Sequence, residues 1–261
     1  MAKKNASPIF SFRFREKIKK WLKMIFMLAL AIFFLFPIVF MLMSSIKEDE
    51  FQVITDMSSL RAFVPVGQLG LQNYRDVFAS LNFGEQAFTS VLVMLTTVIL
   101  GLLINSMIAY ALARLQFSGK NVLLSVVISL IIIPFEAVAV PLLIIVNQFP
   151  WFGGATTWLD TRHVQIFPFI ADAFSIFLFY QFFRNIPKDL EEAALIDGAS
   201  QFGIYWKVVV TLSKPIIATV AILQSLASWN RFMWPLMVTR GPDVRPLTVG
   251  IQSFFGQSPR L

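Results

Sequence analysis

The sequence has 261 residues, of which 57% are hydrophobic and only 14% are charged. A soluble domain of this length carries about 25% charged residues, so the composition indicates a membrane protein. The chain contains no cysteine, which excludes disulfides, thiolate metal sites and a cysteine nucleophile.

The N-terminal segment, residues 1–23, carries eight of the 22 lysine and arginine residues. An apolar run follows it directly, so we interpret the net charge of +7 as a signal of membrane topology and expect no nucleic-acid binding. The run is too long for a signal peptide and no small-residue cleavage site follows it. This favours an uncleaved first span.

Five apolar segments have the roughly 20 residues that a membrane-spanning helix needs. We predict spans at residues 24–46, 87–113, 122–146, 165–183 and 215–237. Prolines interrupt several of these segments, and each removes a backbone donor that lipid cannot replace. The outer loop, residues 47–86, contains a short predicted helix at LQNYRDVF.

Basic residues predict the orientation of the chain. With the N-terminus in the cytoplasm, the inner segments hold 14 basic residues and the outer segments hold seven, while Arg231 lies inside a span. Because positive charge concentrates on the cytoplasmic side, loop 184–214 is expected in the cytoplasm, between the fourth and fifth spans.

The stretch EEAALIDGAS in this loop predicts a short helix, a turn and a second helix. Pro187 and the acids that follow it suit a helix N-terminus. Gly198 can adopt the left-handed conformation that ends a helix, and Ser200 can cap the next one. Three- and four-residue spacing places four side chains on one helix face, where the two alanines make a flat surface: Leu190, Ala193, Ala194 and Asp197.

The residues on that face decide whether the helix rests on lipid or docks on another protein. An interfacial helix resting on lipid carries basic residues above bulky apolar ones. This helix is acidic and small, which fits a groove in another protein better than an anionic membrane. We therefore expect a docking element.

No catalytic or metal constellation is visible. Gly119-Lys120 lacks the upstream glycine of a phosphate-binding loop, and the one histidine, His163, lies in an outer loop. An enzyme is therefore not expected.

The motif Glu192-Ala193-Ala194, followed after three residues by Gly198, resembles the signature cytoplasmic loop of ABC importer membrane subunits. Further stretches extend the resemblance over nearly the whole chain, to the carbohydrate-importer branch and specifically to the second permease of maltose-type systems. These stretches are FPIVFMLMSSIK, LQNYRDVF, NSMIAYALARLQFSGK, IPFEAVAVP, FSIFLFYQFFRNIPKDLEEAALIDGAS, LSKP and WNRFMWPL.

The resemblance implies an all-α polytopic permease fold over residues 24–261, in a bacterial inner membrane, translocating a carbohydrate by alternating access. Loop 184–214 would be the coupling loop that docks on a separate ATPase through Glu191, Glu192, Ala193, Ala194, Asp197 and Gly198. The implied partners are a homologous permease subunit, an ATPase dimer that binds ATP and Mg²⁺, and an extracytoplasmic solute-binding protein. This chain would bind no cofactor itself.

The sequence departs from the family in three places, one of them Arg231, which follows Asn230 and stands where the family commonly has an acidic or polar residue. The family's loop commonly ends I-x-L-P, where this chain has Val208, Val210 and Thr211. The family's core commonly has six spans, of which five are visible here, so we expect either a truncated gene product or an incomplete chain.

Polar residues at membrane depth are candidates for the substrate path. They are Glu136, Trp229, Asn230, Arg231, Asn105 and Tyr110. Glu136 could instead be a buried structural partner, and Arg231 could either bind an anionic substrate or extend to the outer surface. Asn105 and Tyr110 could equally serve as interhelical hydrogen bonds.

Two alternative functions stay open at this point. An ion-coupled transporter or channel would use Glu136 as its ion site and would need no ATP. A non-transporting membrane subunit would fit a missing sixth span. Reconstitution with an ATPase and a substrate screen separates these alternatives.

Overall fold

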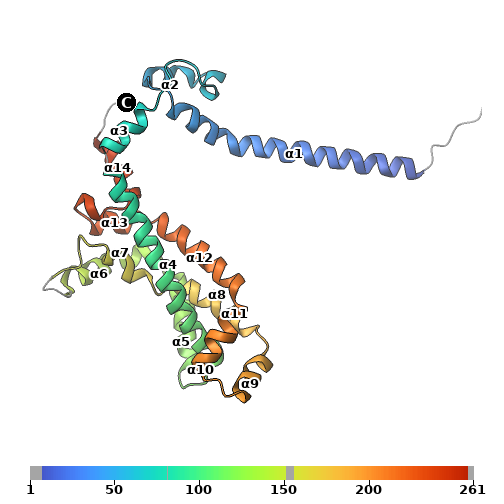
Figure 1. Ribbon diagram of the computed structural model, residues 1–261, viewed down its shortest axis with the longest axis vertical. Helices are drawn as coiled ribbons and strands as arrows, with labels where there is room; N and C mark the ends of the chain where they lie inside the picture. The colour runs from blue at the N-terminus through green and yellow to red at the C-terminus, as the bar shows by residue number, and fades with distance from the viewer. Residues whose placement is uncertain (1–7, 81, 151–155, 258–261) are drawn as a thin grey trace, which may run out of the picture. The chain divides into compact units, whose positions relative to one another are not determined.

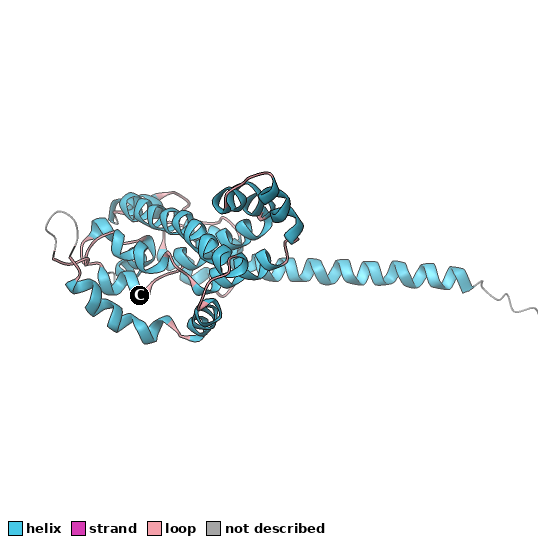
Figure 2. Ribbon diagram, turned by 90° about the horizontal axis from the view of Figure 1, so that it is seen from below, coloured by secondary structure: helices cyan, strands magenta, loops and turns pink. Residues whose placement is uncertain are grey.

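The computed structural model describes residues 8–80, 82–150 and 156–257. Within these ranges the regular elements are helices, and one isolated antiparallel bridge joins Lys47 to Leu69 (Figures 1 and 2). The chain divides into two compact units, Met1–Ser80 and Leu81–Leu261.

The first unit is built on one long helix, α1 (Pro8–Ser45). Its segment Arg15–Ser45 is long and apolar enough to cross a membrane, and its most apolar window has no buried residue. The basic residues from Arg15 to Lys23 and the first predicted span therefore belong to one continuous helix. Three short elements follow: α2 (Glu50–Asp56), η1 (Leu60–Phe63) and α3 (Gln72–Ser80). The helix predicted at LQNYRDVF is confirmed as α3.

A buried ion pair organises the short elements of this unit. The Lys47 side chain donates to Asp56 Oδ2 at 2.8 Å and to the Arg61 carbonyl oxygen at 2.8 Å. The hydrogen bond from Lys47 lowers the pKa of the Asp56 carboxyl below its usual value. Lys47 thus has both its charge and its donors matched although its side chain is buried.

The second unit is arranged around α4 (Phe83–Arg114), against which α8 and α12 pack (Figure 1). Its other elements are α5 (Lys120–Ile132), α6 (Phe135–Gln148), α7 (His163–Ile166), η2 (Phe167–Phe169), α8 (Ala173–Arg184), α9 (Lys188–Ile196), α10 (Gln201–Ile204), η3 (Tyr205–Val209), α11 (Val210–Leu212), α12 (Lys214–Trp229), α13 (Met233–Val238), η4 (Pro242–Val244) and α14 (Leu247–Gln257). At the crossing of α4 and α12, a Cβ added to Gly101 would lie 2.7 Å from Gln224 Oε1, so glycine permits this close approach.

Two of the five predicted spans are bent pairs of helices: the pair α5 and α6 bends by 104°, and the α7–η2 segment and α8 bend by 41°. A third bent pair, at 80°, joins the α10–α11 segment of loop 184–214 to α12. The sharpest bend lies at Pro134, which has no N–H for the Leu130 carbonyl, and the Ile133 N–H bonds that carbonyl instead at 3.3 Å. Counting each pair once, up to five segments are long and apolar enough to cross a membrane.

The fifth span differs from the prediction that it is one helix over residues 215–237. Helix α12 ends at Trp229, and α13 begins only at Met233. The physical reason is Pro235, which has no N–H to donate to the carbonyl oxygen of Arg231 four residues earlier. That oxygen accepts instead from the hydroxyl of Thr248 at 3.2 Å, in helix α14, which the sequence analysis did not predict.

Candidate functional site

The predicted break between two helices in loop 184–214 is confirmed. Helix α9 ends where Gly198 adopts a φ of +80°, and the N–H groups of Gly198 and Ala199 donate to the carbonyls of Leu195 and Ala194 at 3.0 and 2.9 Å. This is a Schellman C-cap. Ser200 then caps α10 by accepting from the Gly203 N–H at 3.2 Å, as predicted.

Helix α9 has no buried residue, but its residues differ in exposure. Glu192 and Ala193 are exposed, and 87% of Ile196 and 44% of Leu190 are accessible. Ala194, by contrast, packs partly buried against the core formed by α4, α8 and η3. The two alanines therefore lie on different faces, although they are adjacent in the sequence.

Glu191 is turned toward the end of α4. Its Oε1 lies 2.9 Å from Arg114 Nε at the end of α4, and the side chains of Arg114 and Glu191 are only 5% and 14% accessible. Arg114 Nη2 also donates to the Ile186 carbonyl oxygen. Burial raises the pKa of the Glu191 carboxyl above its ordinary value, against the opposing charges of Arg114 and Lys188.

Tyr110, one turn before Arg114, also contacts this loop. Its hydroxyl donates to Gln201 Oε1 at 3.0 Å, and its ring is buried. Tyr110 is therefore placed at the loop end of α4 and not in the cavity described next.

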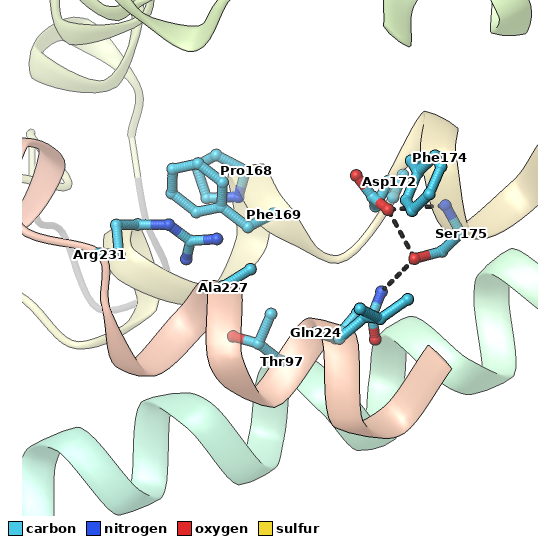
Figure 3. A pocket seen from close by; sticks show the side chains of 11 residues that line it. Thr97, Pro168, Phe169, Asp172, Phe174, Ser175, Gln224, Ala227 and Arg231 are labelled. Atoms are coloured by element: carbon cyan, nitrogen blue, oxygen red, sulfur yellow. Dashed lines mark hydrogen bonds between the residues drawn. The ribbon is translucent and has the colours of Figure 1, made fainter. Parts of the chain in front are cut away.

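A cavity of about 200 Å³ lies between α4, the η2–α8 junction and α12 (Figure 3). Its lining comprises Thr97, Pro168, Phe169, Ala171, Asp172, Phe174, Ser175, Leu223, Gln224, Ala227 and Arg231. On one side of the cavity, Gln224 Nε2 donates to Ser175 Oγ at 3.2 Å, and Ser175 Oγ bonds Asp172 Oδ2 at 2.5 Å.

Arg231 lies on the other side of the same cavity. Its guanidinium carbon is 3.5 Å from the centre of the Phe169 ring, a cation–π contact. Arg231 Nη1, Thr97 Oγ1 and Gln224 Oε1 are buried atoms without a hydrogen-bond partner among the described residues. Buried polar atoms are normally paired, so this cavity offers one donor group and two oxygens that a bound hydroxyl group or water would satisfy.

The other candidates for the substrate path lie outside this lining. Glu136 is exposed in the first turn of α6, directly after the 104° bend. Asn230 is the C-cap of α12, and Trp229 is 42% accessible and lines a smaller neighbouring cavity with Arg231. Asn105 is fully buried on α4 and bonds the backbone at the η2–α8 junction.

Sequence reasoning missed Thr97, Phe169, Ser175 and Gln224. Hydroxyl, amide and aromatic side chains are common in membrane spans, so their type alone carried no signal. The glycine at position 101 was the one available hint, because a glycine inside a helix marks a close approach by another element.

Three comparisons relate the chain to known proteins. The model of the family described as binding-protein-dependent transport system inner membrane component matches residues 101–257. The arabinooligosaccharides transport system permease protein of Bacillus subtilis (strain 168) is 32% identical over 231 residues, 88% of this chain and 78% of the relative. The diacetylchitobiose uptake system permease protein of Streptomyces coelicolor is 32% identical over 220 residues, 84% of this chain and 68% of the relative.

A solved structure is also similar. It is the crystal structure of a bacterial ABC transporter involved in the import of the acidic polysaccharide alginate. The two chains superpose with a TM-score of 0.72 at 25% sequence identity, over 96% of this chain and 82% of the other. The likeness therefore covers both the apolar helices and loop 184–214.

Proposed function

The chain belongs to the binding-protein-dependent transport system inner membrane component family, as a permease subunit of a carbohydrate-importing ABC transporter, and on this premise we propose that α9 docks on the ATPase. The chain is not an enzyme, and ATP is hydrolysed by a separate subunit. In this proposal, closure of the ATPase dimer around ATP and Mg²⁺ displaces loop 184–214, and the permease alternates between inward and outward access.

The exposure of α9 is the observation that carries the docking proposal. Leu190 and Ile196 are large apolar side chains left open on a helix that also presents Glu192. Such a mixed face suits a protein groove, where apolar area is buried and a carboxylate finds a basic partner. Since Glu191 already faces Arg114, we assign the contact with the ATPase to Glu192, Ala193 and Asp197, which are all exposed.

We further propose a bacterial inner-membrane location with a cytoplasmic N-terminus. Helices α5, α9 and α10 lie at the C-terminal end of α4, whereas α7, α13 and α14 lie toward its N-terminal end (Figure 1). Basic residues concentrate at the first of these ends: Arg114, Lys120, Arg184, Lys188, Lys207 and Lys214. The positive-inside rule supports a cytoplasmic position for it.

The cavity beside α4 is our proposal for part of the substrate path. Phe169 and Phe174 offer ring faces, while Thr97, Gln224 and Arg231 offer polar groups without partners among the described residues. This combination suits a carbohydrate, whose CH faces pack on rings and whose hydroxyls form hydrogen bonds. A homologous permease subunit and an extracytoplasmic solute-binding protein would complete the path.

The docking proposal is tested with Glu192→Lys and Gly198→Pro in the complete transporter. Both variants should lose the ATPase during purification and should lose uptake, because one reverses the exposed charge and the other removes the turn. Glu16→Lys, an exposed reversal elsewhere on the proposed cytoplasmic side, is the matched control and should keep both. Wild-type co-purification and uptake in both α9 variants would refute the docking role.

A further inference from the structure

Three polar side chains on one stripe of α4 contact the docking loop. Ser106, Tyr110 and Arg114 are spaced four residues apart, so they lie on the same face and span about 12 Å of helix. We call these three residues and their contacts with the loop the α4 ladder. Each of the three residues contacts a different part of the loop.

The first contact lies deepest in the unit. The hydroxyls of Ser106 and Tyr205 are 2.8 Å apart, and both residues are buried. Tyr205 begins η3, a π-helical turn between α10 and α11. A π-helical turn is rare and is frequently found at functional sites.

The other two contacts follow toward the end of α4. Tyr110 donates to Gln201 in α10, and its ring centre lies 5.3 Å from that of Tyr205. Arg114 meets Glu191 in α9 and the Ile186 carbonyl just before it. The ladder therefore joins α4 to the loop on both sides of the turn at Gly198.

The same helix reaches the cavity. Thr97 on α4 lines it directly, and Asn105 bonds the backbone of Ile170 and Asp172 at the junction that forms another wall. A displacement of the loop would therefore move α4 as long as the contacts of the α4 ladder remain formed. The loop is also connected to the cavity through α8, whose residues Phe174 and Ser175 line it, and through η3 and the bent connection into α12.

We infer that Ser106, Tyr110 and Arg114 are positioning residues that make α4 and the docking loop move together, so that the displacement of α9 reaches the cavity through α4. The inference rests on the proposed docking role of α9. It assigns the ladder to the transmission of movement and not to the binding of the ATPase.

A distance measurement in the complete reconstituted transporter tests the ladder. Because this chain has no cysteine, spin labels at Ser118→Cys, in the exposed turn after α4, and Asp189→Cys, exposed on α9, are specific within it. With the ladder intact, the distance between the labels should be the same in the nucleotide-free and ATP-bound states. A change of this distance in the wild-type ladder would overturn the inference.

Variants of the ladder provide the second arm of the test. The double variant Ser106→Ala, Tyr205→Phe removes only two hydroxyls, and Arg114→Gln removes the charge. Both should keep the ATPase bound but should move the labels apart on ATP binding and lower the substrate transported per ATP by about threefold or more. Wild-type label distances and transport per ATP in the hydroxyl variant would overturn the inference, even if Arg114→Gln fails to fold.

Failure of the docking proposal would look different. If both Glu192→Lys and Gly198→Pro kept the ATPase bound and kept uptake, the docking role would fall, whereas the label distance would still report whether the loop and α4 move together.

Discussion

The side chain of Asn105 bonds the backbone of Asp172 and closes the gap between two helical segments. Its Oδ1 accepts from the Asp172 N–H at 3.0 Å, and its Nδ2 donates to the Ile170 carbonyl at 3.0 Å. Because Asn105 is fully buried, no solvent can replace either bond. The side-chain amide of Asn105 therefore joins both sides of the bend between η2 and α8 to α4.

Replacing Asn105 by alanine should lower the thermal midpoint of the detergent-solubilised protein. The change leaves a backbone donor and a backbone acceptor without partners, at a cost of about 1–3 kcal/mol for each buried group. Asn121→Ala, at an exposed amide in α5, should leave the midpoint unchanged. A midpoint for Asn105→Ala equal to that of the wild type would contradict this account of the bend.

Thr97→Val should impair transport without lowering the stability of the protein. The Thr97 hydroxyl is buried and unpaired among the described residues, so its removal costs the fold no bond and should leave the thermal midpoint unchanged or raised. If the hydroxyl binds substrate, the KM of transport should rise by roughly threefold to tenfold.

Thr89→Val is the matched control for this prediction, on the same helix. The Thr89 hydroxyl accepts from Arg162 Nε at 3.2 Å and donates to the Asp243 carbonyl at 3.2 Å. Thr89→Val should therefore lower the midpoint without changing KM. An unchanged KM for Thr97→Val would argue against the cavity as part of the path.

Gly198→Ala should loosen the end of α9 for a backbone reason alone. A Cβ at Gly198 would meet no atom within 4 Å, but the φ of +80° costs an L-residue about 1–2 kcal/mol. Hydrogen exchange at the amides of Gly198 and Ala199 should accelerate, and less of the ATPase should co-purify.

Gly119→Ala carries the same backbone penalty outside the loop. Gly119 has a φ of +85° and also has no atom within 4 Å of a built Cβ. It should leave ATPase binding intact. Equal loss of the ATPase in both glycine variants would show that the effect does not arise from α9.

The raised pKa of Glu191 predicts a pH dependence of stability. Burial favours the protonated carboxyl in the folded chain, so its pKa lies above the ordinary 4.5. The stabilisation from proton binding is full below pH 4.5 and is lost as the pH rises through the raised pKa. The thermal midpoint of the wild type should therefore fall relative to that of Glu191→Gln over this rise in pH. A constant difference between the two proteins at all pH values would contradict the raised pKa.

Local signals in the sequence predicted the docking loop well. Gly198 and Ser200 act through their own backbone neighbourhood, and the structure confirms both the left-handed turn and the cap. The end of α12 at Trp229 could also have been predicted, because Pro235 has no N–H to donate to the Arg231 carbonyl oxygen. The hydrogen bond that the Thr248 hydroxyl donates to that carbonyl could not, because it depends on the packing of α14.

Contacts between residues far apart in the chain could not be predicted from the sequence. Nothing in the sequence near Arg114 indicates Glu191, and Gln224 on α12 is far in sequence from its partner Ser175, which follows the N-cap Asp172 of α8. The sequence therefore located polar residues at membrane depth, but it did not indicate which of them share a cavity. Arg231 was predicted as a candidate for the path, and the structure places it in that lining, over the Phe169 ring.

The docking of α9 is tested most directly by photo-cross-linking in the complete transporter. A photoreactive residue at Ile196, 87% exposed on α9, should cross-link to the ATPase subunit. The same residue at Ile132, 82% exposed at the end of α5, is matched in type and exposure and should not cross-link to it. No ATPase adduct at Ile196, or an equal yield at Ile132, would contradict the account.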